Sequence, residues 1–498
     1  MKINQKIMSA ILGSVLIFYA ATLISCKNQP DSDSENSTTL KGVTSLFIVN
    51  PTKQKKNYDD TWVKIETVER AAGAETPCET LNLSTESSYI EHTIPFSDVN
   101  FEINEKKTRS ATTKYQKKYV KGQQHTFSDA EYIKQTKIAT MRYEGEFCYI
   151  WTFDDEPNDS KMTDEEITSF AATFDNIYLK ETALCGPKYQ GETVLKSIIT
   201  PNAKISLVLY DIAYDRGTGK IYGYFHPEMY YIRQSGANEI EAIFVDSYFA
   251  KQKEIEKNLF STVSHELNHL LNFANKTLKY GTGMNSWYTE MLSMVTEDFF
   301  MNDLNLSYEN SPQQRLEAFV SGCHSYGFGN WNYNNNDLVS FNYANAYAFG
   351  AFLARNYGGA KLIHEIATNE YVDEESVVKA VNKINNTNLT FTDLLNKFSL
   401  IMINTQNQNS DLPSLKKTCF SEITEEISLI DGSTKKETFS FNLTEIDLTA
   451  IKEIVASKNV YTNRFDIAFD SYGFLFYHFD TKTSVKIKLK DFLTYSAW

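Results

Sequence analysis

The chain has 498 residues, and 63 acidic against 49 basic side chains give it a formal net charge of −14. Such an acidic excess argues against a protein that binds nucleic acid or anionic lipid through its surface field. Once the segments before residue 45 are set aside, the remaining length exceeds one ordinary domain, so several domains are expected.

Residues 1–25 are predicted to be an export signal. Lys2 and Lys6 precede an apolar run from residue 7 to residue 24, which is the pattern of a signal peptide. The run ends in Leu-Ile-Ser-Cys26, which resembles the bacterial lipobox, where the signal is cut before a cysteine that becomes lipidated. We expect acyl chains on Cys26 to anchor the protein to the cell envelope. Lys27 favours the outer membrane or the cell surface. An uncleaved span of about 18 apolar residues is the alternative.

Residues 26–44 contain mostly Asn, Asp, Ser, Thr and Glu. A segment of this composition cannot bury a core and is predicted to be a disordered tether from the lipidated cysteine. Residues 45–105 then alternate short β-prone runs, such as 45–49 and 62–68, with turn clusters. We expect them to form a small β-rich domain.

Residues 106–405 are predicted to form the central domain, in which strands alternate with helices. The apolar runs 204–210 and 242–246 are typical of buried strands. The segment Thr163-Asp-Glu-Glu166 has the form of a capping box and predicts the start of a helix. This mixture of elements indicates an α+β fold.

The segment 265–269 reads His-Glu-x-x-His inside a helical pattern. Histidines four apart lie on one helix face with Cβ atoms about 5–6 Å apart, so His265 and His269 can reach one zinc ion at about 2.0–2.1 Å. Glu266 would lie beside the open coordination position, where a carboxylate can take a proton from metal-bound water and give it to a leaving amine. The sequence therefore predicts a zinc hydrolase.

A catalytic zinc site usually has three protein ligands, so one more is required. Gly281 and Gly283 end the first helical pattern, and a second helical run covers 285–300. Glu290 lies in this run among apolar neighbours and is the predicted third ligand. Glu297 lies two turns further along the same helix and is the alternative.

Residues 406–498 are expected to be β-rich, because the segments 437–443, 465–469 and 485–489 alternate apolar and polar residues. The acidic segment 154–159 could hold Ca²⁺ by charge alone, but it lacks the spacing of a calcium loop, so calcium has no support. The widely spread cysteines exclude a Cys-x-x-Cys metal site, and a disulfide between Cys148 and Cys185 stays open.

The helix from Trp287 to Glu297 resembles the one that completes the metal site in the gluzincin metallopeptidases. The closest likeness is to the hyicolysin family of bacterial zinc metallopeptidases. It rests on the motif, on Asn272-Phe273 after it, and on the segments 139–151, 174–183 and 223–226, and covers roughly residues 110–400. Two departures stand out: Thr289 and Met291 flank Glu290 where aminopeptidase N has Asn and Gly, and Met294 replaces an Asp of thermolysin-type enzymes.

The resemblance implies a thermolysin-like catalytic domain with a mixed sheet, one Zn²⁺ per chain and protein or peptide substrates. A tyrosine downstream of the ligand Glu polarises the scissile carbonyl in aminopeptidase N-like enzymes. Tyr343 fits that place best, and Tyr347 lies one turn later. His226 and His324 are other candidates for this role, although each is expected to be an ordinary polar residue.

Two functions remain to be compared. The first is a membrane-tethered zinc endopeptidase acting on extracytoplasmic proteins. The resemblance alone implies an endopeptidase rather than an aminopeptidase, since the chain lacks the Gly-x-Met-Glu-Asn run that captures a free amino terminus in aminopeptidase N relatives. The second is an inactive peptidase-like surface lipoprotein that serves as an adhesin or binding module. Loss of a ligand or of Glu266 would favour the second, and all of them are present.

Overall fold

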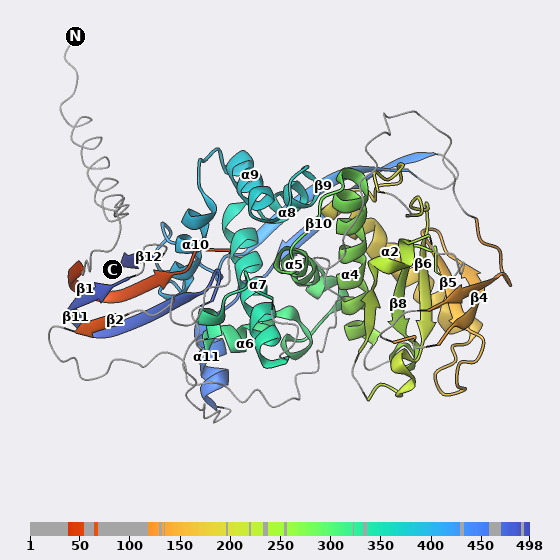
Figure 1. Ribbon diagram of the computed structural model, residues 1–498, viewed down its shortest axis with the longest axis horizontal. Helices are drawn as coiled ribbons and strands as arrows, with labels where there is room; N and C mark the ends of the chain where they lie inside the picture. Colours follow the sequence, from red (N-terminus) through yellow and green to blue (C-terminus); the bar gives the residue numbers. More distant parts are fainter. Residues whose placement is uncertain are drawn as a thin grey trace, which may run out of the picture.

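The computed structural model describes residues 38–53, 64–67, 118–128, 132–133, 135–195, 198–218, 221–232, 238–252, 256–321, 323–331, 336–428, 433–457, 470–489 and 493–498. The predicted export signal, Cys26, most of the tether and of residues 45–105, and the strand expected at 465–469 lie outside these residues. The described chain confirms an α+β fold, with one sheet at each end of the long axis and helices between them (Figure 1).

A six-stranded mixed sheet forms one end of the molecule, in the order β3-β4-β5-β6-β8-β7. Strands β5, β6 and β8 are parallel to one another, whereas β3, β4 and β7 pair antiparallel with their neighbours. The central strands are buried at every position, which explains their continuous apolar sequences. The strands are β3 (Gln124–Phe127), β4 (Lys137–Glu144), β5 (Cys148–Phe153), β6 (Ile205–Tyr210), β7 (Gly223–Phe225) and β8 (Ala242–Asp246).

Two long helices, α2 (Asp164–Cys185) and α4 (Glu256–Asn272), cover one face of this sheet (Figure 1). The predicted capping box is confirmed, because the Thr163 hydroxyl accepts from the Glu166 N–H while the Glu166 carboxylate accepts from the Thr163 N–H. Short helices connect the strands: η3 (Ile212–Tyr214), η4 (Pro227–Tyr230) and α3 (Ser247–Ala250). Strands β6 and β8 confirm the two buried strands expected at 204–210 and 242–246.

A mostly helical layer follows α4 and fills the middle of the molecule (Figure 1). It is apolar almost throughout its interior, so its helices are held mainly by packing, and the helix that begins at Phe391 also has a capping box formed by Thr390 and Asp393. Its elements are η5 (Phe273–Leu278, a π-helix), α5 (Ser286–Leu304), η6 (Tyr308–Asn310), η7 (Pro312–Arg315), α6 (Leu316–Val320), η8 (Cys323–Tyr326), α7 (Asn336–Tyr357), α8 (Gly359–Thr368), α9 (Asp373–Asn385), α10 (Phe391–Ser399) and η9 (Leu400–Met402).

The other end of the molecule is a four-stranded antiparallel sheet in the order β12-β1-β11-β2, here named the terminal sheet. It joins β1 (Thr38–Val49) and β2 (Lys64–Thr67) to β11 (Phe474–Lys488) and β12 (Thr494–Ala497). Two strands from each of the two terminal regions therefore share one sheet. Strand β1 also begins inside the predicted tether, because pairing with β11 satisfies the backbone of residues that are too polar to form a core.

The rest of the C-terminal region consists of a hairpin, β9 (Cys419–Ser428) and β10 (Thr434–Leu443), and helix α11 (Leu448–Ser457). Strands β10 and β11 confirm the β structure predicted at 437–443 and, up to residue 488, at 485–489. No helix among the described residues is long and apolar enough to cross a bilayer.

The disulfide considered between Cys148 and Cys185 is not formed, and both are buried free thiols. Cys148 lies on β5 beside Asp175, whose charge, after burial itself, raises the pKa of that thiol. Cys185 instead accepts from the side-chain amide of Asn268 on α4, with 3.1 Å between Sγ and Nδ2. The two sulfur atoms therefore face different partners.

Candidate metal centre

Helix α4 carries the His-Glu-x-x-His segment at the contact between the sheet and the helical layer. Apolar positions recur every three or four residues along α4 and into η5 and are at most 1% exposed: Leu259, Val263, Leu267, Leu270 and Ala274. This stripe fixes the rotation of the helix against its neighbours. His265 and His269 consequently lie on one face, and neither is exposed to solvent.

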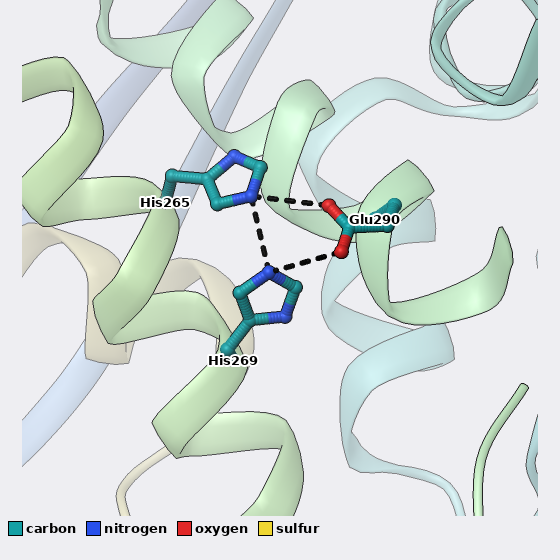
Figure 2. A group of neighbouring side chains, drawn as sticks. All are labelled: His265, His269 and Glu290. Atoms are coloured by element: carbon teal, nitrogen blue, oxygen red, sulfur yellow. Dashed lines mark hydrogen bonds and ion pairs between the residues drawn. The ribbon is translucent and has the colours of Figure 1, made fainter. Parts of the chain in front are cut away.

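Helix α5 brings Glu290 to the two histidines (Figure 2). The Nε2 atoms of His265 and His269 are 3.0 Å apart. The Glu290 carboxylate faces both, with Oε2 at 3.2 Å from His265 Nε2 and Oε1 at 3.5 Å from His269 Nε2. Three ligand-type atoms from two helices thus converge on one point.

The chemistry of this donor set fits zinc. Two imidazole nitrogens and one carboxylate oxygen match a catalytic zinc site with an open fourth position. Nitrogens bound at about 2.0–2.1 Å in a tetrahedral site are about 3.3 Å apart, close to the separation of the two Nε2 atoms. Among the described residues, this is also the one group of three or more His, Cys, Asp or Glu side chains close enough to share a metal ion.

The electrostatics favour the protonation states that a metal requires. Burial lowers the pKa of His269 below its ordinary value, although Glu290 opposes this effect. Burial alone would raise the pKa of Glu290, but the two histidines outweigh it and hold that pKa well below its usual range. A neutral imidazole and an ionised carboxylate are the forms that bind zinc.

Glu297 holds the opposite edge of His265. Its Oε1 lies 2.8 Å from His265 Nδ1, and its Oε2 accepts from the Ser261 hydroxyl at 2.8 Å. A proton on Nδ1 that is donated to Glu297 leaves the Nε2 lone pair directed toward Glu290 and His269. Glu297, the alternative ligand in the sequence, therefore faces the outer nitrogen of His265, and Glu290 is the carboxylate at the ligand position.

A second contact fixes His269 more loosely. The Ser293 hydroxyl lies 3.4 Å from His269 Nδ1 and donates to Asn268 Oδ1 at 3.2 Å. Asn268 in turn donates to Thr296 Oγ1 at 3.0 Å. These buried polar groups tie α4 to α5 below the ligands. They are missing from the sequence-based prediction, because Ser, Thr and Asn carry no motif of their own.

Glu266 is buried and reaches the edge strand β7. Its Oε2 accepts from the Phe225 N–H at 2.8 Å. Gly223 lets β7 lie close to β8, because a Cβ there would lie 2.9 Å from the Phe244 carbonyl oxygen, whereas Glu266 Cγ of α4 would be at an ordinary contact distance of 3.8 Å. The backbone of β7 thus orients this carboxylate, and sequence reasoning missed the contact.

Tyr343 and Tyr347 lie on α7, one turn apart. The Tyr343 ring packs against Trp331, with centroids 4.9 Å apart, and the Arg315 guanidinium carbon lies 4.9 Å from its centroid. Tyr347 is fully buried, and burial followed by the charge of Asp298 raises its pKa. Tyr347 therefore lies beside a carboxylate, whereas Tyr343 lies beside a cation. The catalytic role of either tyrosine stays a prediction.

The other residues singled out in the sequence have structural partners. His324 is bonded through Nδ1 to the Phe474 carbonyl at 2.7 Å and stacks on that ring, and burial lowers its pKa to about 4. His226 caps η4 by accepting from the Glu228 N–H at 3.1 Å. In the acidic segment, Asp154 accepts from Gln124 and Thr140. These contacts explain the positions of the three side chains, and no bound ligand is needed for that explanation.

Comparison with known proteins adds two findings. A model of the family described as Peptidase M30 matches residues 133–436 of this chain. The neutral metalloprotease ShpI of Staphylococcus hyicus is 27% identical over 277 residues, which make up 53% of this chain and 58% of that protein. The matched part therefore includes the metal centre and the six-stranded sheet from β4 onward.

Proposed function

The chain belongs to the peptidase M30 family, and we propose that it is a zinc-dependent endopeptidase with His265, His269 and Glu290 as its metal ligands. The observation that carries the proposal is the convergence of these three buried side chains on one point (Figure 2). Family membership supports hydrolysis of peptide bonds. The identity of the metal, the endopeptidase mode and the assignment to the gluzincins rest on the donor set and on the resemblance noted above.

Glu266 is proposed as the general base and then the general acid. Zinc, when bound, makes a water molecule acidic enough to be deprotonated near neutral pH and polarises a carbonyl group. The Phe225 N–H holds one oxygen of Glu266, so the carboxylate keeps a single orientation while it accepts a proton and passes it to the leaving amine. Burial of Glu266 excludes bulk water, which strengthens this proton transfer.

Tyr343 is proposed to donate a hydrogen bond to the developing oxyanion. The positive charge of the Arg315 guanidinium, which lies over the Tyr343 ring, polarises the phenol O–H and makes it a stronger hydrogen-bond donor. Tyr343 is 5% exposed, so it lies just below the surface. Removal of an oxyanion donor typically costs about 2.7–4 kcal/mol of transition-state stabilisation.

The substrate is proposed to bind along β7. This strand ends the six-stranded sheet and pairs on one side with β8. An extended peptide can add to such an edge through main-chain hydrogen bonds. The peptide would then pass the helix that carries Glu266, since Phe225 of β7 bonds to that residue. Binding of this kind needs no free amino terminus, which favours an endopeptidase acting on protein substrates.

Anchoring through a lipidated Cys26 in the bacterial cell envelope is proposed from the sequence alone. It would keep the enzyme outside the cytoplasm, where protein substrates from the surroundings are accessible.

The proposal is tested by the zinc content and the casein or quenched-peptide cleavage of wild type, Glu266→Ala and the matched control Glu165→Ala, whose side chain is exposed in the first turn of α2. We expect one zinc per chain in all three proteins and loss of cleavage in Glu266→Ala alone. If zinc binds but wild type cleaves nothing, the inactive binding lipoprotein becomes the better account. Absence of zinc from wild type would refute the metal site.

A further inference from the structure

A tight turn at residues 470–473, at the start of β11, connects the terminal sheet to the helical layer. Tyr472 N–H donates to the Asn50 carbonyl at 2.9 Å, and Asn50 N–H donates to the Gly473 carbonyl at 3.0 Å. On its other side the turn touches residues 327–329, since the Gly329 N–H donates to the Ser471 carbonyl at 2.9 Å. The turn is thus held from both sides.

The side chain of Tyr472 extends from this turn to the first turn of α5. Its ring packs against Trp287, with centroids 6.0 Å apart, and against Phe391 at 5.1 Å. Its hydroxyl donates to Glu374 Oε1 at 2.5 Å. Trp287 precedes the metal ligand Glu290 by three residues on the same helix. Tyr472 therefore contacts both α5 and the beginning of α9.

Asp373, the neighbour of Glu374, binds the residue that precedes α5. Its Oδ1 accepts from the Asn285 N–H at 2.8 Å, and its Oδ2 accepts from the Asn285 side-chain amide. Asn285 is the N-cap residue of α5, and its own side chain makes no capping bond to the helix. The Asp373 carboxylate thus holds the N-cap residue in place, at the helix end where negative charge is stabilising.

The backbone of Asp373 indicates that this contact is specific. Its φ is +54°, in the left-handed region that residues other than glycine rarely adopt. Such a conformation persists when surrounding contacts hold it. Lys53, which follows β1, adds an ion pair to each acid, at 3.7 Å to Asp373 Oδ2 and 3.2 Å to Glu374 Oε2. The end of β1 and the start of β11, which are paired in the terminal sheet, therefore meet near the start of α5.

We propose that Asp373 and Tyr472 are positioning residues for Glu290, so that the terminal sheet sets the metal affinity of a site formed by other elements. The inference rests on the proposed function, since it takes Glu290 as a zinc ligand. The physical basis is the short distance along α5: Asn285 and Glu290 are less than two helical turns apart. A rigid helix therefore transmits a shift of its first turn to the Glu290 carboxylate.

Titration of Asp373 should change this support. Burial, opposed by the Asn285 N–H and by Lys53, raises the pKa of Asp373 to about 6. The charged and titratable groups that face it are Lys53, Glu374 and, through Glu374, Tyr472. A protonated carboxyl turns one acceptor oxygen into a donor, so it cannot accept both Asn285 bonds. The folded protein takes up this proton as the pH falls through about 6, and the hold on α5 weakens there.

The experiment measures the zinc dissociation constant of the full chain by competition with a chromophoric chelator at pH 7.5 and pH 5.5. Thermal unfolding of each zinc-free protein is measured in parallel. The variants are Asp373→Ala, Asp373→Asn and Tyr472→Phe. Asp175→Ala is the matched control, because Asp175 also accepts two backbone N–H groups, those of Glu146 and Phe147, but in the β4–β5 turn.

We expect Asp373→Ala to weaken zinc binding about tenfold at pH 7.5 and Tyr472→Phe to weaken it about threefold. Asp175→Ala should lose stability with unchanged zinc affinity. Asp373→Asn keeps two hydrogen bonds if the Asn285 amide turns over, and it cannot titrate. Its zinc affinity should therefore fall less than that of wild type between pH 7.5 and pH 5.5.

Two results would overturn the inference while leaving the proposed function intact. One is zinc affinity in Asp373→Ala and Tyr472→Phe within twofold of wild type. The other is an equal loss in Asp175→Ala, which would mean that general destabilisation is the cause. Failure of wild type to bind zinc is a different result, because it refutes the proposed metal site and the inference together.

Discussion

The metal centre and the terminal sheet are built from opposite kinds of sequence information. The proposed metal ligands lie within 26 consecutive residues on two adjacent helices, and the residue types and their spacing indicate the chemistry. The terminal sheet joins β1 to β11 across more than 400 residues, and nothing in either segment specifies the other. Local chemistry was therefore readable in the sequence, whereas the support that reaches α5 from the terminal sheet was not.

The largest effect should come from the face of the terminal sheet that packs against the helical layer. Phe47 is fully buried and stacks on Phe476, with centroids 4.8 Å apart. Phe47→Ala should lower the free energy of unfolding by about 3–5 kcal/mol, measured by denaturant titration. The folded fraction should still bind one zinc per chain, because the sheet supplies no ligand. Less than one zinc per folded chain would mean that the metal centre depends on the terminal sheet for its formation.

Removal of the proposed third ligand should have an effect of similar size, but on zinc binding and not on the free energy of unfolding. Glu290→Ala should weaken zinc binding about a thousandfold, or about 4 kcal/mol, measured by chelator competition. Glu165→Ala is the control for loss of an acid elsewhere. Unchanged zinc affinity in Glu290→Ala would remove this residue from the site and reopen the role of Glu297.

Tyr343→Phe should lower kcat about a hundredfold, or about 2.7 kcal/mol, with zinc content unchanged. Tyr347→Phe is the matched control on the next turn of α7, and its buried hydroxyl lies beside Asp298. Steady-state cleavage of a quenched peptide measures both. If Tyr347→Phe has the larger effect on kcat, Tyr347 and not Tyr343 is the oxyanion donor.

The smallest of these effects concerns the partner of a ligand. Glu297→Ala removes the carboxylate 2.8 Å from His265 Nδ1 and should weaken zinc binding about tenfold, or about 1.4 kcal/mol. Glu297→Gln keeps an acceptor oxygen and should recover most of the affinity. An effect as large as that of Glu290→Ala would contradict the separation between ligand and positioning residue.

The fold was predictable where a pattern repeats over a short distance. The capping box at Thr163, the buried strands β6 and β8 and the helices around His265 and Glu290 all follow from neighbouring residues. Pairing of β1 with β11 could not be predicted, because the local sequence of a strand does not identify the strand with which it pairs.

The same limit applies to the site. His265, Glu266 and His269 form a motif, and Glu290 was the next acid on a helix. The hydrogen bond from the Phe225 N–H to Glu266 could not be predicted, because a backbone donor is not specified by residue type. The contact of Asp373 with Asn285 could not be predicted, because it joins segments 88 residues apart. It also depends on the positive φ of Asp373, which no sequence pattern predicts.

Strand β1 can pair with β11 only after residues 50–473, which separate them, have been synthesised. At roughly 5–20 residues per second, the first strand waits for tens of seconds while the segments between are made. The support that Lys53 and Tyr472 give to α5 is therefore among the last contacts to form. While the intervening segments are made, the helix that carries Glu290 therefore lacks these contacts.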